Sequence, residues 1–452
     1  MAKLYFYGGA RSVTGANYVI ETQNSRIMVD CGLAQGTRYA EEQNYRPFSY
    51  DPAAIDAVLI THAHIDHTGM LPKLVKDGFS GKIFMTRPTR DFAEIMLRDA
   101  QGLLQGEADR DKHDVLYSPD DLAKTIGLME GVDYGEEIEI LQDIKVRFRD
   151  AGHVLGSAII EVWAEGKKIV FSGDLGNPPT PLLRATEYIE DGDYVVVEST
   201  YGDRLHEHMD ERKNLLEDAI EDTVGRGGVV MIPSFALEKT QELLYELNSL
   251  VENHRIPEVP VFIDSPLAID ATQIYKKYPE YYNTKAAYLI QSGDQLFKFP
   301  RLKFTYTVEE SKQINDVPAP KIIIAGSGMS SGGRILHHEI RYLPDPNSLL
   351  LFMSYQSAGS LGRRLFEKTD SVKIFGETVP VRCEVRAIGG YSSHADKEAL
   401  YHWVAHIKNG GILKKVFVVQ GEEGPSLALV QLLRDNLGVD AQAPLLGDVV
   451  EL

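Results

Sequence analysis

Four potential metal ligands lie within six residues of this chain, in the sequence His62-Ala63-His64-Ile65-Asp66-His67. They follow an apolar run at residues 55–60 (IDAVLI) that has the length and composition of a buried strand. A turn at the end of such a strand projects the imidazoles and the carboxylate outward together, where one or two cations can gather them. Neutral imidazole and carboxylate are ligands that zinc prefers, and a catalytic zinc site keeps one position open for water. The spacing therefore predicts a metal site at a strand end.

Three further potential ligands follow other strand-like segments. Asp30 and Asp174 each close a short apolar segment, and His153 lies in the glycine-containing stretch 150–157 (DAGHVLGS). Each residue alone is more typical of a turn or a helix cap. Their order along the chain, with Asp30 before the histidine-rich turn and His153 and Asp174 after it, favours a shared metal site.

Length, charge and cysteine content restrict the class of protein. A chain of 452 residues exceeds what one hydrophobic core usually supports, so we expect two domains. The two cysteines, Cys31 and Cys383, are too few for a disulfide framework, and the N-terminus has no leader pattern, so we expect a cytoplasmic protein. No apolar run approaches the roughly 20 residues that span a bilayer, so we expect no membrane partner. The net charge of −19 governs solubility and long-range steering, and it does not exclude a polyanionic substrate in a local cleft.

The pattern of apolar segments predicts an α/β fold. Continuously apolar stretches such as 195–197 (VVV), 229–232 (VVMI), 322–324 (III) and 416–419 (VFVV) are typical of buried parallel strands. Leucines at helical spacing lie between such stretches. Alternating strands and helices indicate crossover units and sheets covered by helices.

Six short motifs follow from residue 198 onward. They are ESTYGD (198–203), IPSFA (232–236), DSPLA (264–268), GSGMSSGGR (326–334), YQSAGSLGRR (355–364) and GGYSSHAD (389–396).

The motif at 326–334 is expected to open a helix after a parallel strand, where backbone amides and the helix dipole can receive a phosphate. A glycine turn between strand and helix is the alternative interpretation. The arginine pair of the 355–364 motif could clamp phosphates or form a solvated helix face. The residues that we consider as phosphate-binding are Ser327, Gly328, Met329, Arg334, Arg363, Arg364 and Ser392.

Together these motifs resemble those of the metallo-β-lactamase superfamily and, over nearly the entire chain, of its β-CASP branch, which acts on nucleic acids. Within that branch the chain is similar to bacterial and archaeal RNases related to the endonuclease subunit of the cleavage and polyadenylation specificity factor. The resemblance implies two zinc ions per chain. It assigns His62, His64 and His153 to the first zinc, Asp66 and His67 to the second, and Asp174 to a bridge between them. Asp30 would orient ligand imidazoles by hydrogen bonding.

The same resemblance assigns catalytic roles to Glu198 and His394, beside Asp30, Asp66 and Asp174. Hydrolysis of a phosphodiester needs a nucleophile at neutral pH and a proton for the leaving oxygen. Zinc supplies the first by lowering the pKa of bound water to about 7. A histidine near its usual pKa of about 6.5 can supply the second, if a carboxylate such as Glu198 orients it.

One position departs from the family pattern. After the segment 416–419, RNA-processing relatives carry a histidine that completes the second zinc site, and branches acting on DNA more often carry an apolar residue. This chain has Gln420 there. A glutamine carbonyl is a weaker zinc ligand than imidazole, so we expect the second zinc to be bound less tightly.

The resemblance implies a metallo-β-lactamase αβ/βα sandwich built from residues 1–203 and 369–452, with a parallel α/β β-CASP domain inserted at 204–368. It implies zinc-dependent, endonucleolytic hydrolysis of single-stranded RNA by metal-activated hydroxide and a His/Glu general acid pair. A homodimer is one possible assembly. Two alternatives stay open: a catalytically silent RNA-binding β-CASP subunit, and a thioester hydrolase of the same superfamily. The first usually lacks several ligands, whereas this chain departs at one, and the second does not explain residues 204–368.

Overall fold

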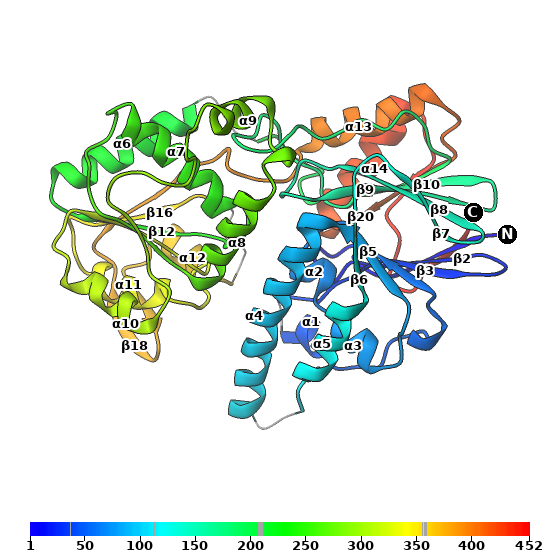
Figure 1. Ribbon diagram of the computed structural model, residues 1–452, viewed down its shortest axis with the longest axis horizontal. Coiled ribbons are helices and arrows are strands. Elements are labelled where there is room, and N and C mark those ends of the chain that lie inside the picture. Colours follow the sequence, from blue (N-terminus) through cyan, green and yellow to red (C-terminus); the bar gives the residue numbers. More distant parts are fainter. Residues whose placement is uncertain (37, 112–113, 207–210, 355, 357–358) are drawn as a thin grey trace. The chain divides into compact units, whose positions relative to one another are not determined.

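A computed structural model describes the chain except for residues 37, 112–113, 207–210, 355 and 357–358 (Figure 1). The polypeptide divides into two units. Unit 1 comprises Met1–Leu205 and Ser393–Leu452, and unit 2 comprises His206–Ser392. In the described part of the chain, no helix is both long and apolar enough to cross a membrane.

The first sheet of unit 1 has seven strands in the order β22-β1-β2-β3-β4-β5-β6. Neighbours from β3 to β6 are parallel, and β22, β1, β2 and β3 pair antiparallel. The strands are β1 (Lys3–Gly8), β2 (Asn17–Glu21), β3 (Arg26–Cys31), β4 (Ala57–Leu59), β5 (Lys82–Thr86), β6 (Met129–Val132) and β22 (Val449–Glu451). The helices of this half are α1 (Arg38–Gln43), α2 (Ile65–Thr68), α3 (Leu71–Lys76), α4 (Arg87–Asp111) and α5 (Pro119–Leu128), with α4 lying along the sheet in Figure 1.

The second sheet of unit 1 also has seven strands, in the order β21-β20-β11-β10-β9-β8-β7. The strands are β7 (Glu137–Leu141), β8 (Ile144–Asp150), β9 (Ala158–Ala164), β10 (Lys167–Phe171), β11 (Tyr194–Glu198), β20 (Lys415–Val419) and β21 (Ala441–Gln442). Helices α13 (Lys397–Gly410) and α14 (Glu423–Leu437) pack on its outer face, where Trp403 and Leu429 join Val195 and Val197 in one apolar cluster.

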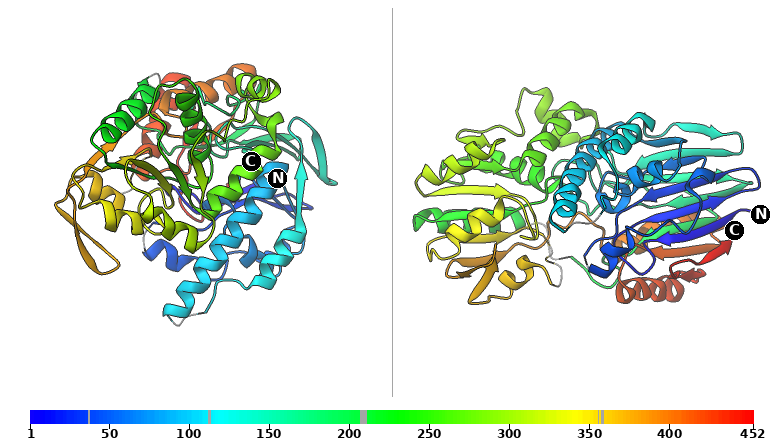
Figure 2. Two further views of the ribbon diagram at one scale, coloured as in Figure 1. Left: turned by 60° about the vertical axis from the view of Figure 1, so that its left-hand side comes forward. Right: turned by 90° about the horizontal axis from the view of Figure 1, so that it is seen from below.

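The inner faces of the two sheets pack on each other and form the main core of unit 1. Aromatic rings meet across it, with Phe6 and Phe417 at 5.2 Å and Tyr18 and Phe171 at 6.1 Å between ring centroids. The layers are therefore helices, sheet, sheet and helices, as the view from below in Figure 2 shows. This arrangement confirms the αβ/βα sandwich that the motifs predicted.

Strand direction decides where the loops of the second sheet lie. Strands β10, β11 and β20 are mutually parallel, and β8 runs with them because β8 and β10 are both antiparallel to β9. The loops that follow these four strands therefore emerge at one edge of the sheet. That edge carries the functional residues.

Unit 2 is a parallel sheet with helices, as expected for an inserted α/β domain. Its six strands have the order β14-β13-β15-β12-β16-β19, and every neighbouring pair is parallel. The strands are β12 (Val229–Pro233), β13 (Val261–Asp264), β14 (Leu302–Phe304), β15 (Lys321–Ala325), β16 (Leu349–Phe352) and β19 (Glu384–Ala387), and a separate hairpin contains β17 (Ser371–Ile374) and β18 (Glu377–Pro380). The helices are α6 (Arg212–Gly225), α7 (Lys239–Glu252), α8 (Pro266–Lys277), α9 (Thr284–Gln291), α10 (Val308–Gln313), α11 (Ile335–Tyr342) and α12 (Leu361–Phe366).

Residues 369–392, which we expected in the return segment of the first domain, lie in unit 2. The reason is strand pairing, because β19 extends the parallel sheet beside β16. Val372 and Val379 of the hairpin pack into the same apolar cluster as that sheet.

Candidate metal centre

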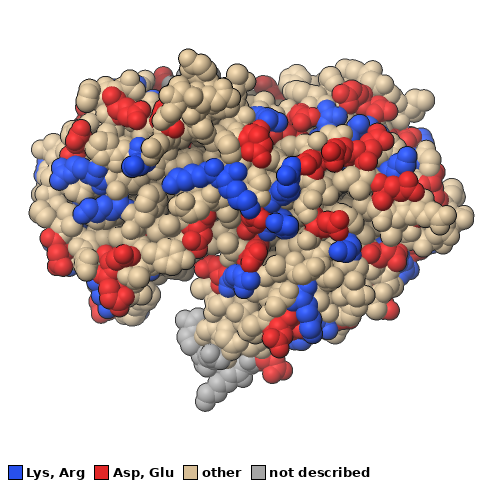
Figure 3. Space-filling model, viewed as in Figure 1, with Lys and Arg blue, Asp and Glu red and all other residues tan. Residues whose placement is uncertain are grey.

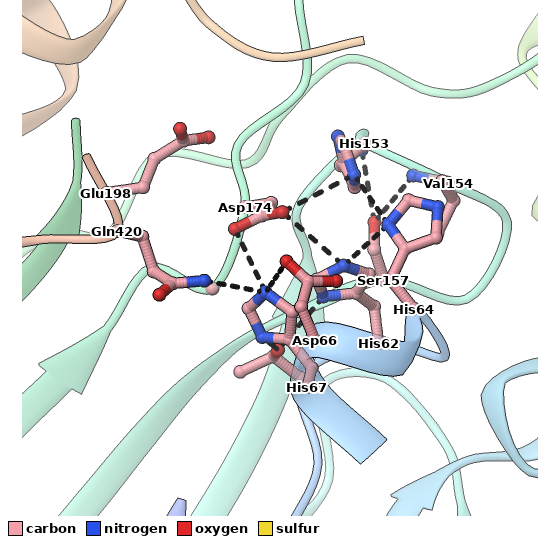
Figure 4. Close-up of polar contacts among 12 residues, drawn as sticks. His62, His64, Asp66, His67, His153, Val154, Ser157, Asp174, Glu198 and Gln420 are labelled. Carbon is pink, nitrogen blue, oxygen red and sulfur yellow. Dashed lines mark hydrogen bonds and ion pairs between the residues drawn. The ribbon is translucent and has the colours of Figure 1, made fainter. Parts of the chain in front are cut away.

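Loops at the ends of the two sheets of unit 1 bring the predicted ligands together (Figure 4). The turn after β4 carries His62 and His64, the β8–β9 loop carries His153, and the turn after β10 carries Asp174. A backbone hydrogen bond of 2.7 Å from the Ala158 nitrogen to the Thr61 carbonyl joins the loops of the two sheets. The edges of the sandwich thus meet at this cluster.

Three imidazoles and one carboxylate surround a first potential metal position. The Nε2 atom of His62 lies 2.9 Å from His64 Nδ1 and 3.4 Å from Asp174 Oδ2. The Nε2 atom of His153 lies 3.3 Å from His64 Nδ1 and 3.6 Å from Asp174 Oδ2. Ligands about 2.0–2.2 Å from a tetrahedral zinc are separated by roughly 3.3–3.6 Å. Three of these spacings match that range, and the 2.9 Å between His62 and His64 is shorter.

The Nδ1 atoms of His62 and His153, which face away from the cluster, already make hydrogen bonds. His62 Nδ1 lies 3.1 Å from Thr61 Oγ1, whose hydroxyl proton goes to Asp30, and His153 Nδ1 donates to the Ser393 carbonyl at 3.2 Å. Both rings therefore direct an unprotonated Nε2 at the cluster. Two nitrogen lone pairs and a carboxylate converge there, an arrangement that a cation stabilises.

A second potential position lies around His67 Nε2. This atom is 3.5 Å from Asp174 Oδ1 and 3.7 Å from Asp66 Oδ2. Asp174 consequently directs one carboxylate oxygen to each position, as expected of a bridging residue. Its Oδ1 atom is buried and has no hydrogen-bond partner among the described residues.

Asp30 holds the far side of His67. Its Oδ2 accepts a 2.8 Å hydrogen bond from His67 Nδ1, and its Oδ1 accepts from the Thr61 backbone nitrogen at 2.8 Å. Asp30 is buried and has a positive φ of 58°. It contacts Thr61 and His67 and lies outside the cluster centre, and its orienting role stays a prediction.

The charges of the cluster favour a bound cation. Burial raises the pKa of Asp174 to about 7. Burial opposes protonation of His67, but the carboxylates of Asp174, Asp30 and Asp66 outweigh it and raise its pKa to about 10. Burial and the neighbouring imidazoles lower the pKa of His62 well below its usual value, which keeps that ring neutral. Positive charge is thus stabilised beside the carboxylates.

Glu198 and His394 adjoin the cluster. Glu198 ends β11, is fully buried, and accepts a 2.7 Å hydrogen bond from the Leu175 nitrogen. His394 Nδ1 lies 3.3 Å from both Glu198 oxygens and 3.9 Å from Asp174 Oδ2. Burial opposes protonation of His394, but Glu198 outweighs it and raises the pKa to about 9. A charged imidazole beside a carboxylate is the arrangement of a general acid.

Gln420 follows β20 and reaches the second position. Its Nε2 lies 3.0 Å from His67 Nε2, and its Oε1 is buried without a hydrogen-bond partner among the described residues. The side chain therefore lies beside His67, and metal binding by Gln420 stays a prediction.

The predicted phosphate-binding residues all lie in unit 2. Ser327, Gly328, Met329 and Arg334 occupy the β15–α11 loop. The motif at 326–334 forms a closed loop before α11, because Ser327 N bonds to Gly332 O and Ile335 N to Gly326 O. Arg334 donates to Asp264 Oδ1 at 2.8 Å and to the carbonyls of Thr305 and Tyr306.

The remaining phosphate candidates are Arg363 and Arg364 in α12 and Ser392 at the end of unit 2. Arg363 Nε donates to Glu367 at 2.7 Å, and Arg364 is exposed. Three residues of their motif, at 355 and 357–358, lie outside the described residues. Phosphate binding by these side chains stays a prediction.

Sequence reasoning missed several residues that support the ligands. Thr61 bonds both Asp30 and His62, and Ser157 Oγ accepts from the His153 and Val154 backbone nitrogens at 3.1 and 3.2 Å. Thr61 directly precedes the histidine-rich turn, so its position in the sequence could have indicated that it supports the ligands. The Ser157 hydroxyl carried no such signal.

The sandwich and its cluster of histidines and aspartates define a divalent-metal site of the metallo-β-lactamase type. Family models match the chain over three ranges: the metallo-beta-lactamase superfamily at residues 13–234, the Beta-Casp domain at 240–365, and the Zn-dependent metallo-hydrolase RNA specificity domain at 378–444. The chain belongs to the β-CASP branch of the metallo-β-lactamase superfamily, a family of metal-dependent hydrolases.

Named relatives support this membership. Ribonuclease TTHA0252 of Thermus thermophilus is 37% identical over 427 residues, which cover 94% of this chain and 95% of the relative. The RNase J-like protein of Methanocaldococcus jannaschii is 31% identical over the whole of both chains. Transcription termination factor FttA of Methanosarcina mazei is 31% identical over 96% of this chain and 69% of its own length. A crystal structure of a protein of unknown function from Enterococcus faecalis V583 shares the fold, with a TM-score of 0.56 and 12% identity over the whole of both chains.

Proposed function

We propose that this protein is a zinc-dependent ribonuclease that cleaves single-stranded RNA endonucleolytically. The observation that carries the proposal is that two groups of potential ligands share Asp174. In each group, the ligand atoms lie within 4.8 Å of one another. The first group is His62, His64, His153 and Asp174, and the second is Asp174, Glu198 and His394. The first group offers a metal position and the second a proton donor. Relatives named as ribonucleases support RNA as the substrate.

The donor set fits zinc, with two ions per chain. His62, His64, His153 and Asp174 Oδ2 would hold the first, and Asp66, His67 and Asp174 Oδ1 the second. When bound, the zinc ions would supply a nucleophile from water at neutral pH and neutralise charge on the phosphoryl group. Imidazole and carboxylate donors are typical of catalytic zinc.

The chain's own residues would handle the leaving group. Glu198 accepts from His394 Nδ1, so a proton held on the opposite nitrogen, Nε2, can be passed to an oxygen. Products with a 5′-phosphate and a 3′-hydroxyl, as the family resemblance implies, require cleavage of the P–O3′ bond. The 3′-oxygen leaves with that bonding electron pair and takes the proton from His394.

A polyanionic substrate is compatible with a net charge of −19. On the face drawn in Figure 3, basic and acidic side chains are intermixed and form no continuous acidic field. Local charge at the site, rather than net charge, governs phosphate binding.

End-labelled RNA tests the proposal directly. An oligonucleotide labelled at its 5′ end should yield labelled fragments of intermediate length, and the same RNA labelled at its 3′ end should yield the complementary fragments. Asp174→Ala should abolish cleavage, because it removes an oxygen from both metal positions, whereas His402→Ala, at an exposed histidine of the same unit, should leave it unchanged. DNA of the same sequence and a thioester should both be poor substrates. Full activity of Asp174→Ala, or thioester hydrolysis without RNA cleavage, would refute the proposal, and light scattering would test for the homodimer.

A further inference from the structure

The backbone of Gln420 is held in an unusual conformation next to the second metal position. Its φ is 48°, in the left-handed region that few non-glycine residues adopt. Its nitrogen donates to the Gly9 carbonyl at 2.7 Å, and its carbonyl accepts from Thr200 Oγ1 at 3.1 Å. Such backbone strain at a site is retained when surrounding contacts impose it, and here those contacts aim the side chain at His67.

Two buried polar atoms face the same small space behind Gln420. The Oε1 atom of Gln420 and the hydroxyl of Tyr18 both lack a hydrogen-bond partner among the described residues, and each side chain is 3% exposed. Each atom lies 2.4 Å from the point that a Cβ on Gly9 would occupy. Gly9 has a φ of 63°, so a glycine there suits the backbone and leaves this space open.

A cavity of about 10 Å³ borders both side chains, together with Asp30, Thr61 and His67. That volume is near the lower limit for one water molecule, which needs two or more polar partners. Tyr18 and Gln420 make no direct hydrogen bond in the structure, and a single water in this cavity can bridge them.

The two possible orientations of the amide are not equivalent. With Oε1 turned to Tyr18, the phenolic proton has an acceptor, and the amide nitrogen faces His67 at 3.0 Å. With the amide reversed, both the amide and the phenol would present protons to the same space, and the phenolic proton would lose that acceptor. An unmatched buried donor is costly, so the first orientation is favoured.

We propose that Tyr18 holds the Gln420 amide with its oxygen turned away from the second metal position, so that Gln420 is a hydrogen-bond donor facing that position and not a metal ligand. An N–H group there favours an anionic oxygen, such as a non-bridging phosphate oxygen of the substrate, over a cation. The inference rests on the proposed zinc centre. It gives Gln420 a role that differs from that of the histidine in RNA-processing relatives.

Zinc retention tests the proposal without using RNA. Zinc per chain is measured after dialysis against graded chelator for the wild type, Gln420→Ala, Gln420→His, Tyr18→Phe and the Tyr18→Phe/Gln420→Ala double variant. Gln420→Ala should retain zinc at least as well as the wild type, because no ligand is lost and an N–H group that disfavours a cation is removed. Tyr18→Phe should raise the chelator concentration for half-release by about 3–10-fold, the worth of one hydrogen bond, because the freed amide can turn its oxygen inward. The double variant should behave as Gln420→Ala does, and Gln420→His should retain more zinc than the wild type.

Tyr5→Phe, on the neighbouring strand β1, is the matched control and should leave retention unchanged. Zinc release from Gln420→Ala at a lower chelator concentration than from the wild type would show that Gln420 is a ligand and would overturn the proposal. Zinc retention by Tyr18→Phe equal to that of the wild type would also overturn it.

A second measurement separates this inference from the proposed function. In chelator-treated protein, the losses in melting temperature from Tyr18→Phe and Gln420→Ala should be smaller together than their sum, because both remove one shared hydrogen bond. Additive losses would refute the pairing. A wild-type chain that binds no zinc would instead refute the zinc centre, and the melting experiment would still test the pairing.

Discussion

We expect Asp30 to determine which nitrogen of His67 carries a proton, and Asp30→Asn is the sharpest test of that expectation. In the structure, Asp30 Oδ2 accepts from His67 Nδ1 at 2.8 Å, while Oδ1 accepts from the Thr61 nitrogen at 2.8 Å. Asparagine can keep the Thr61 bond with its oxygen. Its amide nitrogen then faces His67 Nδ1, and two donors cannot share one hydrogen bond.

His67 can relieve this conflict by moving its proton to Nε2. That tautomer has no lone pair on the atom that faces Asp66 and Asp174, so the second position loses a ligand. Residues that orient metal ligands typically contribute 10–100-fold to metal affinity, or about 1.4–2.7 kcal/mol. We expect Asp30→Asn to weaken the second zinc by this factor and the first zinc much less.

Graded chelation with zinc counted per chain should resolve two release steps. In Asp30→Asn the weaker step should shift to lower chelator concentration by 10–100-fold, and cleavage of end-labelled RNA should fall at limiting zinc. Asp56→Asn is the matched control, because Asp56 is an exposed carboxylate that accepts from the Arg26 nitrogen at the other end of the same strand. The reasoning fails if Asp30→Asn releases zinc as the wild type does, or if the tighter step alone moves.

Three further predictions concern proton transfer, pH and metal. His394→Ala should slow the chemical step by about 10²–10⁴-fold with little change in zinc content, and loss of zinc with activity would make His394 a ligand. Asp264 is buried, but hydrogen bonds led by His338 lower its pKa to about 2, so Asp264→Asn should cost about 2–3 kcal/mol of unfolding free energy at pH 7. This carboxylate stabilises the fold above about pH 4 and loses its effect as pH falls through 2. The difference in unfolding free energy between variant and wild type, measured in urea, should therefore shrink over that range. A difference that stays constant would contradict the assignment. Chelator should lower the melting temperature, and zinc at about 100-fold its dissociation constant should restore about 2.7 kcal/mol, whereas an unchanged melting curve would exclude a structural contribution from the metal.

The features that could be predicted from the sequence are those formed by residues close together in the chain, within one strand, helix or turn. The turn after β4 carries His62, His64 and His67 within six residues, so their convergence needs only a strand and a turn. Continuous apolar segments such as β12 and β15 predicted buried parallel strands, and the structure pairs them as such. The fold class followed because strand and helix patterns alternate along the chain.

Features that depend on distant segments could not be predicted. Arg334 bonds Asp264 across neighbouring parallel strands, and nothing in either motif indicates that pairing. Strand β19 (EVRA) is short and only partly apolar, so its place beside β16 was not recognisable, and residues 369–392 were expected in the other domain. Tyr18 belongs to the same buried cluster as Ile20 of β2 and is indistinguishable from a packing aromatic in the sequence.

The conformation of two residues links these observations at His67. Asp30 on its Nδ1 side and Gln420 on its Nε2 side both have positive φ, at 58° and 48°. A non-glycine residue in that region is disfavoured, and two of them on opposite sides of one imidazole indicate that its surroundings are imposed by the fold. Asp30 can only accept from the ring, and an amide nitrogen of Gln420 can only donate toward it. With zinc bound, Asp30 would accept the proton on Nδ1, and Nε2 would be the ring nitrogen without a proton. A histidine in place of Gln420 would offer a lone pair where this chain offers a proton, so histidine would strengthen cation binding at the second position and glutamine weakens it.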